Sequence, residues 1–458
     1  MANAAAPAPA AVPLGDAFRT WCRVAALSFG GPAGQIAVMH RIVVDEKKWI
    51  DDERFLHALN YCMLLPGPEA QQLATYIGWL LHGTRGALMA GVLFVLPGCV
   101  AILLLSILYA SFEQSNLLQA LFFGLKPAVL AIVVEAVIRI GRRVLKSGTL
   151  VAIAVAAFVS IFALALPFPV LVVAAGMIGL VGGRIWPERF GLAGRAASAK
   201  QTPQSAPVAI AQRPAVRPSL ARSLRVAATC LTLWFAPLAA LWAALGPDSI
   251  YFQIGAFFSK AAVVTFGGAY AVLAYIAQQA VEKYGWLQPG EILDGLGMAE
   301  TTPGPLIMVV QFVGFLAAYR RPGPFGPLAG GIVASLLTTW VTFVPCFLWI
   351  LLGAPYIERL RGNRPLGSAL SAITAAVVGV ILNLAIWFSI HTLFGQVEVY
   401  RAGPLRLELP IFSTVDPAAC AIAALACLLT FYWHRGMALT LGLSAAIGAA
   451  WFFVRGGG

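Results

Sequence analysis

Two short motifs, Ser28-Phe29-Gly30-Gly31 and Pro66-Gly67-Pro68, lie within apolar stretches of the first half of the chain. Both recur 237 residues later, without a gap, as Thr265-Phe266-Gly267-Gly268 and Pro303-Gly304-Pro305. Such spacing in two separate motifs does not arise by chance, so the chain contains an internal repeat. We therefore expect two halves with the same fold.

The composition around these motifs is that of a membrane protein. Of the 458 residues, 60% are apolar and only 11% are charged, against roughly one quarter charged in a soluble domain. Apolar stretches longer than 18 residues recur along the chain, which predicts spanning helices. Residues 86–112 and 150–183 are almost continuously apolar instead of alternating, which argues against an outer-membrane barrel. We expect an all-α polytopic membrane protein with about 10–13 membrane segments.

The number of segments between the repeated motifs predicts how the halves are inserted. Six apolar segments precede a polar linker, and one further segment, 222–245, follows it before the second half begins. These seven segments are an odd number of membrane spans. Each element of the second half therefore runs across the membrane in the direction opposite to that of its counterpart in the first half. We therefore predict inverted halves with broken or re-entrant helices, the architecture of many secondary transporters.

The linker differs sharply from the rest of the chain. From Arg184 to Arg225 there are eight basic residues and one acid, Glu188, and residues 193–218 are rich in Ala, Pro, Ser and Gln. This composition is typical of a flexible linker, and its charge places it in the cytoplasm by the positive-inside rule. We accordingly expect a tail, a first transport half, a cytoplasmic linker, a connecting helix and a second transport half, at residues 1–16, 17–183, 184–221, 222–245 and 246–458.

The repeated motifs interrupt helices at membrane depth. Free backbone groups are tolerated there only where they line a cavity or are buried in protein. Each break also exposes a helix N-terminus, whose N–H groups and dipole bind an anion without a metal ion. Ser28 and Thr265 precede the breaks and are expected to add hydroxyl donors. In the simpler interpretation the glycines permit close packing and the prolines only kink the helices. The sequence leaves open whether segments 17–44 and 55–81 span or re-enter.

Three cations are candidates for attracting an anionic substrate. Arg23 and Lys260 are related by the repeat offset, and each lies five residues before the Ser or Thr that precedes a Phe-Gly-Gly motif. Lys126 lies near the middle of segment 117–138, where a charge is expensive and therefore a functional candidate. The competing interpretation of Arg23 and Lys260 is that their long side chains extend to water near a segment end.

Three glutamates are candidates for coupling transport to protons. Glu69 follows the first Pro-Gly-Pro, beside a predicted helix start, where the alternative role is simple stabilisation of that helix. Glu135 is out of phase with Lys126 on the same helix, so the two form no obvious pair. Glu300 precedes the second Pro-Gly-Pro, and its repeat counterpart is Met63.

Sequence patterns for cofactors are missing. The seven cysteines show no CxxC or Cys/His spacing, so neither disulfides nor a zinc site is predicted. The phosphate-loop pattern GxxxxGK[ST] does not occur, so no ATP site and no cofactor are predicted. Much of the net charge of +12 resides in the linker, and we expect no nucleic-acid partner.

The motif regions resemble a known family. Residues 28–41 read Ser-Phe-Gly-Gly-Pro-Ala-Gly-Gln-Ile-Ala-Val-Met-His-Arg, and residues 55–72 contain the first Pro-Gly-Pro followed by Glu-Ala-Gln-Gln. Both are similar to the chromate ion transporter (CHR) family, long-chain bidomain type. Residues 265–270 and 302–305 fit its C-terminal domain.

The resemblance covers residues 17–183 and 222–455. It implies a multi-pass protein of the inner (plasma) membrane that exports chromate, is driven by the proton motive force and confers chromate resistance. A cell interior negative by ~100 mV expels a dianion with roughly 2 × 2.3 kcal/mol, so export needs no ATP. Sulfate, a tetrahedral dianion, is the natural competitor, and an integral-membrane enzyme is the rival class. Uniport or proton antiport, and monomer or homodimer, stay open.

The predicted substrate-binding residues comprise the motif residues, the three cations and one glutamine in the first motif region: Arg23, Ser28, Gly30, Gly31, Gln35, Pro66, Gly67, Pro68, Lys126, Lys260, Thr265, Gly267, Gly268, Pro303, Gly304 and Pro305. The predicted coupling residues are Glu69, Glu135 and Glu300. The expected partners are chromate and the lipid bilayer, and no catalytic or metal-binding residues are predicted.

Overall fold

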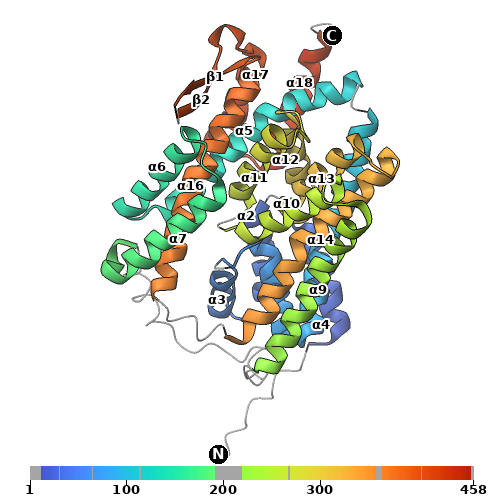
Figure 1. Cartoon of the computed structure of the whole chain (residues 1–458), viewed down its shortest axis with the longest axis vertical. Helices are drawn as coiled ribbons and strands as arrows, with labels where there is room; N and C mark the ends of the chain where they lie inside the picture. Colours follow the sequence, from blue (N-terminus) through green and yellow to red (C-terminus); the bar gives the residue numbers. More distant parts are fainter. Residues whose placement is uncertain are drawn as a thin grey trace, which may run out of the picture.

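The computed structural model describes residues 12–29, 31–63, 65–112, 115–190, 219–266, 269–356, 364–403 and 405–454. These residues are almost entirely helical (Figure 1). The exception is one antiparallel hairpin, β1 (Val397–Ala402) and β2 (Leu405–Pro410), in which Val397 lies opposite Pro410. The predicted all-α polytopic class is confirmed, and the hairpin is an addition that we did not predict.

The first half begins with short helices and continues with long ones. Its elements are α1 (Leu14–Leu27), α2 (Gly31–His40), the π-helix η1 (Arg41–Glu46), α3 (Asp52–Cys62), α4 (Glu69–Phe112), α5 (Asn116–Val144), α6 (Gly148–Phe162), α7 (Phe168–Ile185) and η2 (Pro187–Phe190). Side-chain caps fix several starts, because Asp51, Ser115 and Ser147 each accept a hydrogen bond from a backbone N–H in the first turn of α3, α5 and α6.

Helix α9 (Leu220–Leu245) precedes the second half, which repeats the order of the first. Its elements are α10 (Ile250–Val264), α11 (Ala269–Gln278), the π-helix η4 (Gln279–Lys283), α12 (Glu291–Thr301), η5 (Leu306–Met308), α13 (Val309–Arg320), α14 (Pro327–Gly353), η6 (Ala354–Tyr356), α16 (Arg364–Leu393), the hairpin, η7 (Phe412–Thr414), α17 (Pro417–Cys427), η8 (Leu428–Tyr432) and α18 (Met437–Val454). Even the short π-helix after the second helix occurs in both halves.

Helix α4 is two helices joined by a sharp turn. His82 and Gly83 leave helical geometry, and Gly83 has φ +63°, a conformation that favours glycine. The chain folds back so closely that a side chain at Gly78 would overlap the carbonyl of Gly86. Residues 69–81 and 84–112 therefore form a hairpin, equivalent to α13 and α14 of the second half.

Seven described helices are long and apolar enough to cross a membrane. They are Glu69–Phe112, Asn116–Val144, Phe168–Ile185, Leu220–Leu245, Pro327–Tyr356, Pro365–Leu393 and Met437–Val454. Large apolar side chains are exposed at every fourth residue along α4, at Leu88, Val92, Leu96, Val100 and Leu104. A stripe of this kind suits contact with lipid tails.

The two halves interlock through their long helices. Gly124 of α5 lies against the Ser444 backbone of α18, and Gly179 of α7 lies against Ala372 of α16. Small residues at these crossings let the backbones approach closely. Each half thus packs its helices against helices of the other, while α2, α10 and α11 lie in the middle of the view (Figure 1).

Candidate functional site

The four repeated motifs meet at one place, although they are far apart in the sequence. The Gly67 N–H donates a hydrogen bond of 2.7 Å to the Thr265 carbonyl, and the Gly304 N–H donates one of 2.9 Å to the Ser28 carbonyl. These two bonds are related by the repeat. Each Pro-Gly-Pro loop therefore contacts the Phe-Gly-Gly loop of the other half, a reciprocal contact like that of a two-fold dimer. We call this place the central crossing.

The glycines of both Pro-Gly-Pro loops are required by conformation and by space. Gly67 has φ +125° and Gly304 has φ +109°, where L side chains are rare. A Cβ at Gly304 would lie 2.8 Å from the Cα of Gly98 in α4, and one at Gly67 would lie 2.9 Å from the Sγ of Cys346 in α14. The loops thus pack tightly against the long helices, so the packing interpretation holds for these two glycines.

Two half-helices begin at the central crossing and approach the same carboxyl group. Helix α2 starts at Gly31, where a Cβ would lie 3.7 Å from Glu300 Oε2. Tyr270, in the first turn of α11, donates a hydrogen bond of 2.5 Å to Glu300 Oε1. Glu300 is 4% exposed, and its Oε2 has no hydrogen-bond partner among the described residues. A buried carboxyl thus lies beside the positive start of α2, which stabilises an anion, and accepts a hydrogen bond from the Tyr270 side chain of α11.

The motif hydroxyls do not point toward this carboxyl. Ser28 Oγ donates to the Val24 carbonyl and Thr265 Oγ1 donates to the Ala261 carbonyl, each at 2.6 Å. Both bonds lie within the preceding helix, four residues back. The proton of each hydroxyl therefore already forms a hydrogen bond, and only the oxygen lone pairs are available to accept one from another group.

Two glutamines support the loops. Gln35 Nε2 donates to the Gly304 carbonyl at 2.6 Å, and Gln72 Nε2 donates to the Pro66 carbonyl at 2.7 Å. Both side chains are buried. In this structure Gln35 positions the second Pro-Gly-Pro loop, and this contact spans 269 residues of sequence.

The three predicted cations do not contact the central crossing. Arg23 forms an ion pair of 2.6 Å with Glu46. Lys126 lies 3.5 Å from Asp294, a buried acid of α12. Lys260 is exposed and lines a separate hollow beside α10. The structure therefore does not bring these cations together at the breaks.

Two arginines of α5 do approach the break loops, and the sequence analysis missed them. Arg143 Nη2 lies 3.2 Å from the Sδ of Met63, at the end of α3, and its charge acts on Glu69. Glu69 is the first residue of α4, as expected, and its Oε2 is buried without a hydrogen-bond partner among the described residues. Arg143 is thus the cation beside the first Pro-Gly-Pro loop.

Arg139 lies one turn earlier on the same face of α5. It pairs with Glu135 at 3.2 Å, and its charge acts on Glu300 and Tyr270 from a longer distance. Helix α5 therefore carries two arginines on the face from which Arg143 contacts the end of α3. Their spacing of four residues, beside Glu135, is the sequence signal that they share a helix face.

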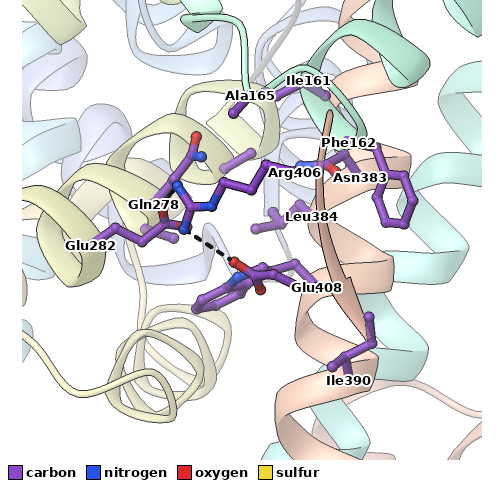
Figure 2. A pocket seen from close by; sticks show the side chains of 13 residues that line it. Ile161, Phe162, Ala165, Gln278, Glu282, Asn383, Leu384, Ile390, Arg406 and Glu408 are labelled. Atoms are coloured by element: carbon purple, nitrogen blue, oxygen red, sulfur yellow. Dashed lines mark ion pairs between the residues drawn. The ribbon is translucent and has the colours of Figure 1, made fainter. Parts of the chain in front are cut away.

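A small cavity away from the central crossing is lined by more acidic than basic side chains and therefore does not suit an anion. It has a volume of about 50 Å³ and lies between the hairpin, η4 and α6 (Figure 2). Arg406 lies 3.0 Å from Glu282 and 3.6 Å from Glu408, so two carboxylates surround one guanidinium. This cluster attaches the hairpin to η4.

Comparison with known proteins places this architecture in a family. The family described as chromate transporter matches residues 15–180 and 252–449. The chain belongs to the chromate transporter family. The predicted family membership is therefore confirmed, and together with its apolar helices it makes the chain a multi-pass protein of the plasma membrane.

Three curated relatives share most of their length with this transporter. The chromate transport protein of Pseudomonas aeruginosa is 31% identical over 412 residues, which cover 89% of this chain and 87% of the relative. The chromate transport protein of Cupriavidus metallidurans is 28% identical over 364 residues, 80% of each chain. The probable chromate transport protein of Synechococcus elongatus is 25% identical over 424 residues, which cover 90% of this chain and 94% of the relative. No solved structure matches.

The comparisons identify the family and leave the roles of single residues as predictions. Gly30, Gly267 and Gly268 lie outside the described residues. The orientation of the two halves in the membrane also stays a prediction.

Proposed function

We propose that this transporter exports chromate from the cytoplasm, driven by the proton motive force, and so confers chromate resistance. The observation that supports this most is that the start of α2 and the Tyr270 hydroxyl of α11 meet at one buried carboxyl group, Glu300. Helix N-termini stabilise negative charge, and this effect strengthens where water is excluded. The tetrahedral dianion binds there, between the halves.

Glu300 couples this site to protons. Its carboxylate and a dianion compete for the same positive start of α2, because two anions in one buried site repel each other. The groups that face it are Tyr270 of α11, the start of α2 at Gly31, and Arg139 and Glu135 of α5. Protonation removes the competing charge and admits the oxyanion, so a proton and the dianion are bound together. One proton leaving with the dianion still moves one net negative charge out of the cell, and the membrane potential drives this step.

Arg139 and Arg143 attract the dianion to the crossing. A guanidinium presents several N–H donors in a plane and suits oxyanions better than an ammonium does. Arg143 lies 3.2 Å from Met63, before the first Pro-Gly-Pro loop, and Arg139 lies one turn earlier on the same helix face. The substrate therefore meets two cations on one helix.

The halves are inserted in opposite orientations and rock about the central crossing. The odd number of segments between them and their reciprocal hydrogen bonds support this arrangement. Access then alternates between the two membrane sides while the crossing stays in place.

The test is uptake of labelled chromate into everted membrane vesicles, which reports export from the cell. We expect accumulation that an uncoupler abolishes and that excess sulfate reduces only weakly. Glu300→Gln should keep uptake driven by the membrane potential but lose the dependence of uptake on pH. The matched control is Glu398→Gln, on the exposed face of β1, which should behave as wild type. Uncoupler-insensitive uptake by the wild type contradicts the driving force, and an unchanged pH dependence in Glu300→Gln contradicts the coupling through Glu300.

A further inference from the structure

The two halves carry different charges at one pair of equivalent positions. In the first half Arg23 is neutralised by Glu46, with 2.6 Å between Nη1 and Oε2. The repeat offset of 237 relates these residues to Lys260 and Lys283. The second half therefore carries two cations where the first carries an ion pair. Neither lysine forms an ion pair with any residue that the structure describes.

The two lysines line an open hollow. Its volume is about 250 Å³, whereas one water needs only roughly 10–15 Å³ on this measure. Lys260, Gln253 and Tyr275 line it together with Lys283 and Tyr284, and no acidic side chain is among its lining residues. Glu282, the neighbour of Lys283, pairs instead with Arg406 of the hairpin at 3.0 Å. The hollow is therefore electropositive.

The hollow lies beside the helix that ends at the central crossing. It begins where the turn at Pro247 leads into α10 and extends along that helix to Lys260. Thr265, which accepts the hydrogen bond from Gly67 at the crossing, lies five residues further on, about 7.5 Å along a helix. The far wall comes from η4 and the residue after it, Tyr284. An anion in the hollow is thus close to the transport site without occupying it.

We propose that this hollow is a binding site for a tetrahedral oxyanion, held by the ammonium groups of Lys260 and Lys283. Two like charges beside one water-accessible hollow repel each other, and an anion between them removes that repulsion. Two sources offer this chemistry, the transported dianion and the phosphate of an anionic lipid. The first source rests on the proposed function, whereas the second does not. Because Glu46 fills the corresponding place, the first half has no such site.

The test measures binding without transport. The full-length transporter in phosphatidylcholine nanodiscs is treated with an amine-reactive ester, and mass spectrometry follows the modification of Lys260 and Lys283. We expect millimolar chromate or sulfate to slow both reactions at least threefold relative to chloride of equal ionic strength. Lys47, an exposed lysine of the first half, is the internal control and should react at a constant rate.

A second arm distinguishes the two sources. Phosphatidylglycerol is added to the nanodiscs in place of the free oxyanions. Protection by chromate and sulfate in neutral lipid assigns the site to the transported dianion. Protection by phosphatidylglycerol alone assigns it to a lipid phosphate. Equal reactivity under all conditions overturns the proposal, and this result would leave chromate export itself untouched.

A variant tests the comparison between the halves directly. Lys283→Glu copies the charge pair of the first half and should abolish the protection of Lys260. Where the dianion is the occupant, the KM for chromate uptake should rise about two- to fivefold, the range of a single exposed charge pair, with little change in the maximal rate. Lys47→Glu makes the same charge change elsewhere and should leave KM unchanged. Full protection of Lys260 in Lys283→Glu contradicts the site.

Discussion

The first and second halves share a backbone design but differ in the charges placed on it. Both contain a helix, a break, a second helix that ends in a π-helix, and a Pro-Gly-Pro loop that contacts the other half. At equivalent positions, however, the first half has Met63 and the second has Glu300. Glu46 and Lys283 are a second such difference. The shared backbone builds the crossing, and the unshared charges give the two sides different chemistry.

The two Pro-Gly-Pro glycines provide the strongest way to break this symmetry. Gly304→Ala places a methyl group against the backbone of Gly98, which cannot move aside, and should cost about 1–3 kcal/mol in strain. Gly67→Ala meets the side chains of Gln72 and Cys346, which can shift. We expect Gly304→Ala to abolish chromate uptake and lower the protein level in membranes, and Gly67→Ala to be milder. Immunoblots and vesicle uptake measure both, and equal losses would remove the distinction.

Gly31 sharpens the comparison, because space is available there. The nearest atom to an added Cβ lies 3.7 Å away, but φ is +70°, so alanine is strained by about 1–2 kcal/mol. The strain falls on the start of α2, next to Glu300. We expect Gly31→Ala to keep near-normal abundance while uptake per molecule collapses. Reduced abundance with normal uptake per molecule indicates a packing role instead.

The arginines of α5 should have an intermediate effect. Arg143→Gln removes a charged donor beside the first Pro-Gly-Pro loop and should raise the KM for chromate about tenfold, since a hydrogen bond to a charged group contributes about 1.5–3 kcal/mol. Arg139→Gln should act similarly at the second loop. Arg142→Gln is the matched control on another face of the helix and should keep the wild-type KM. Equal KM values in all three variants would rule out a role for these arginines.

The motif hydroxyls should matter least. Ser28 and Thr265 already donate to carbonyls of their own helices, so Ser28→Ala and Thr265→Val remove no donor from the site. We expect uptake to change by less than about twofold in either variant. A much larger loss in both, at normal abundance, shows that the hydroxyls turn toward the substrate during transport.

Much of the skeleton could be predicted from the sequence. The exact spacing of two motifs revealed the repeat, and the apolar runs revealed the helices. Proline removes a helical N–H donor and glycine adopts non-helical conformations readily, so the breaks between α1 and α2 and before α4 have a local signal in the sequence. The hairpin also left a local signal, since residues 397–402 and 405–409 include alternating polar and apolar residues on either side of Gly403.

The partners of the charged side chains could not be predicted in the same way. Lys126 lies beside Asp294, and Arg23 lies beside Glu46, because of how helices pack and not because of their spacing. The crossing itself joins residues of different halves, and such contacts depend on the whole fold. Arg139 and Arg143 resembled a cytoplasmic loop because the apolar run ends near them, although α5 continues to Val144.

The exchanged hydrogen bonds have a consequence for assembly. Each Pro-Gly-Pro loop finds its N–H acceptor in the other half, and α5 and α16 pack against helices of the opposite half. A half on its own therefore lacks these hydrogen-bond acceptors and packing partners, and only a second half can supply them. A chain divided between residues 190 and 219 becomes an obligate pair of fragments, whose joining is a bimolecular reaction that depends on their concentration in the membrane. The covalent linker converts this encounter into an intramolecular one and fixes the ratio of the two halves at one to one.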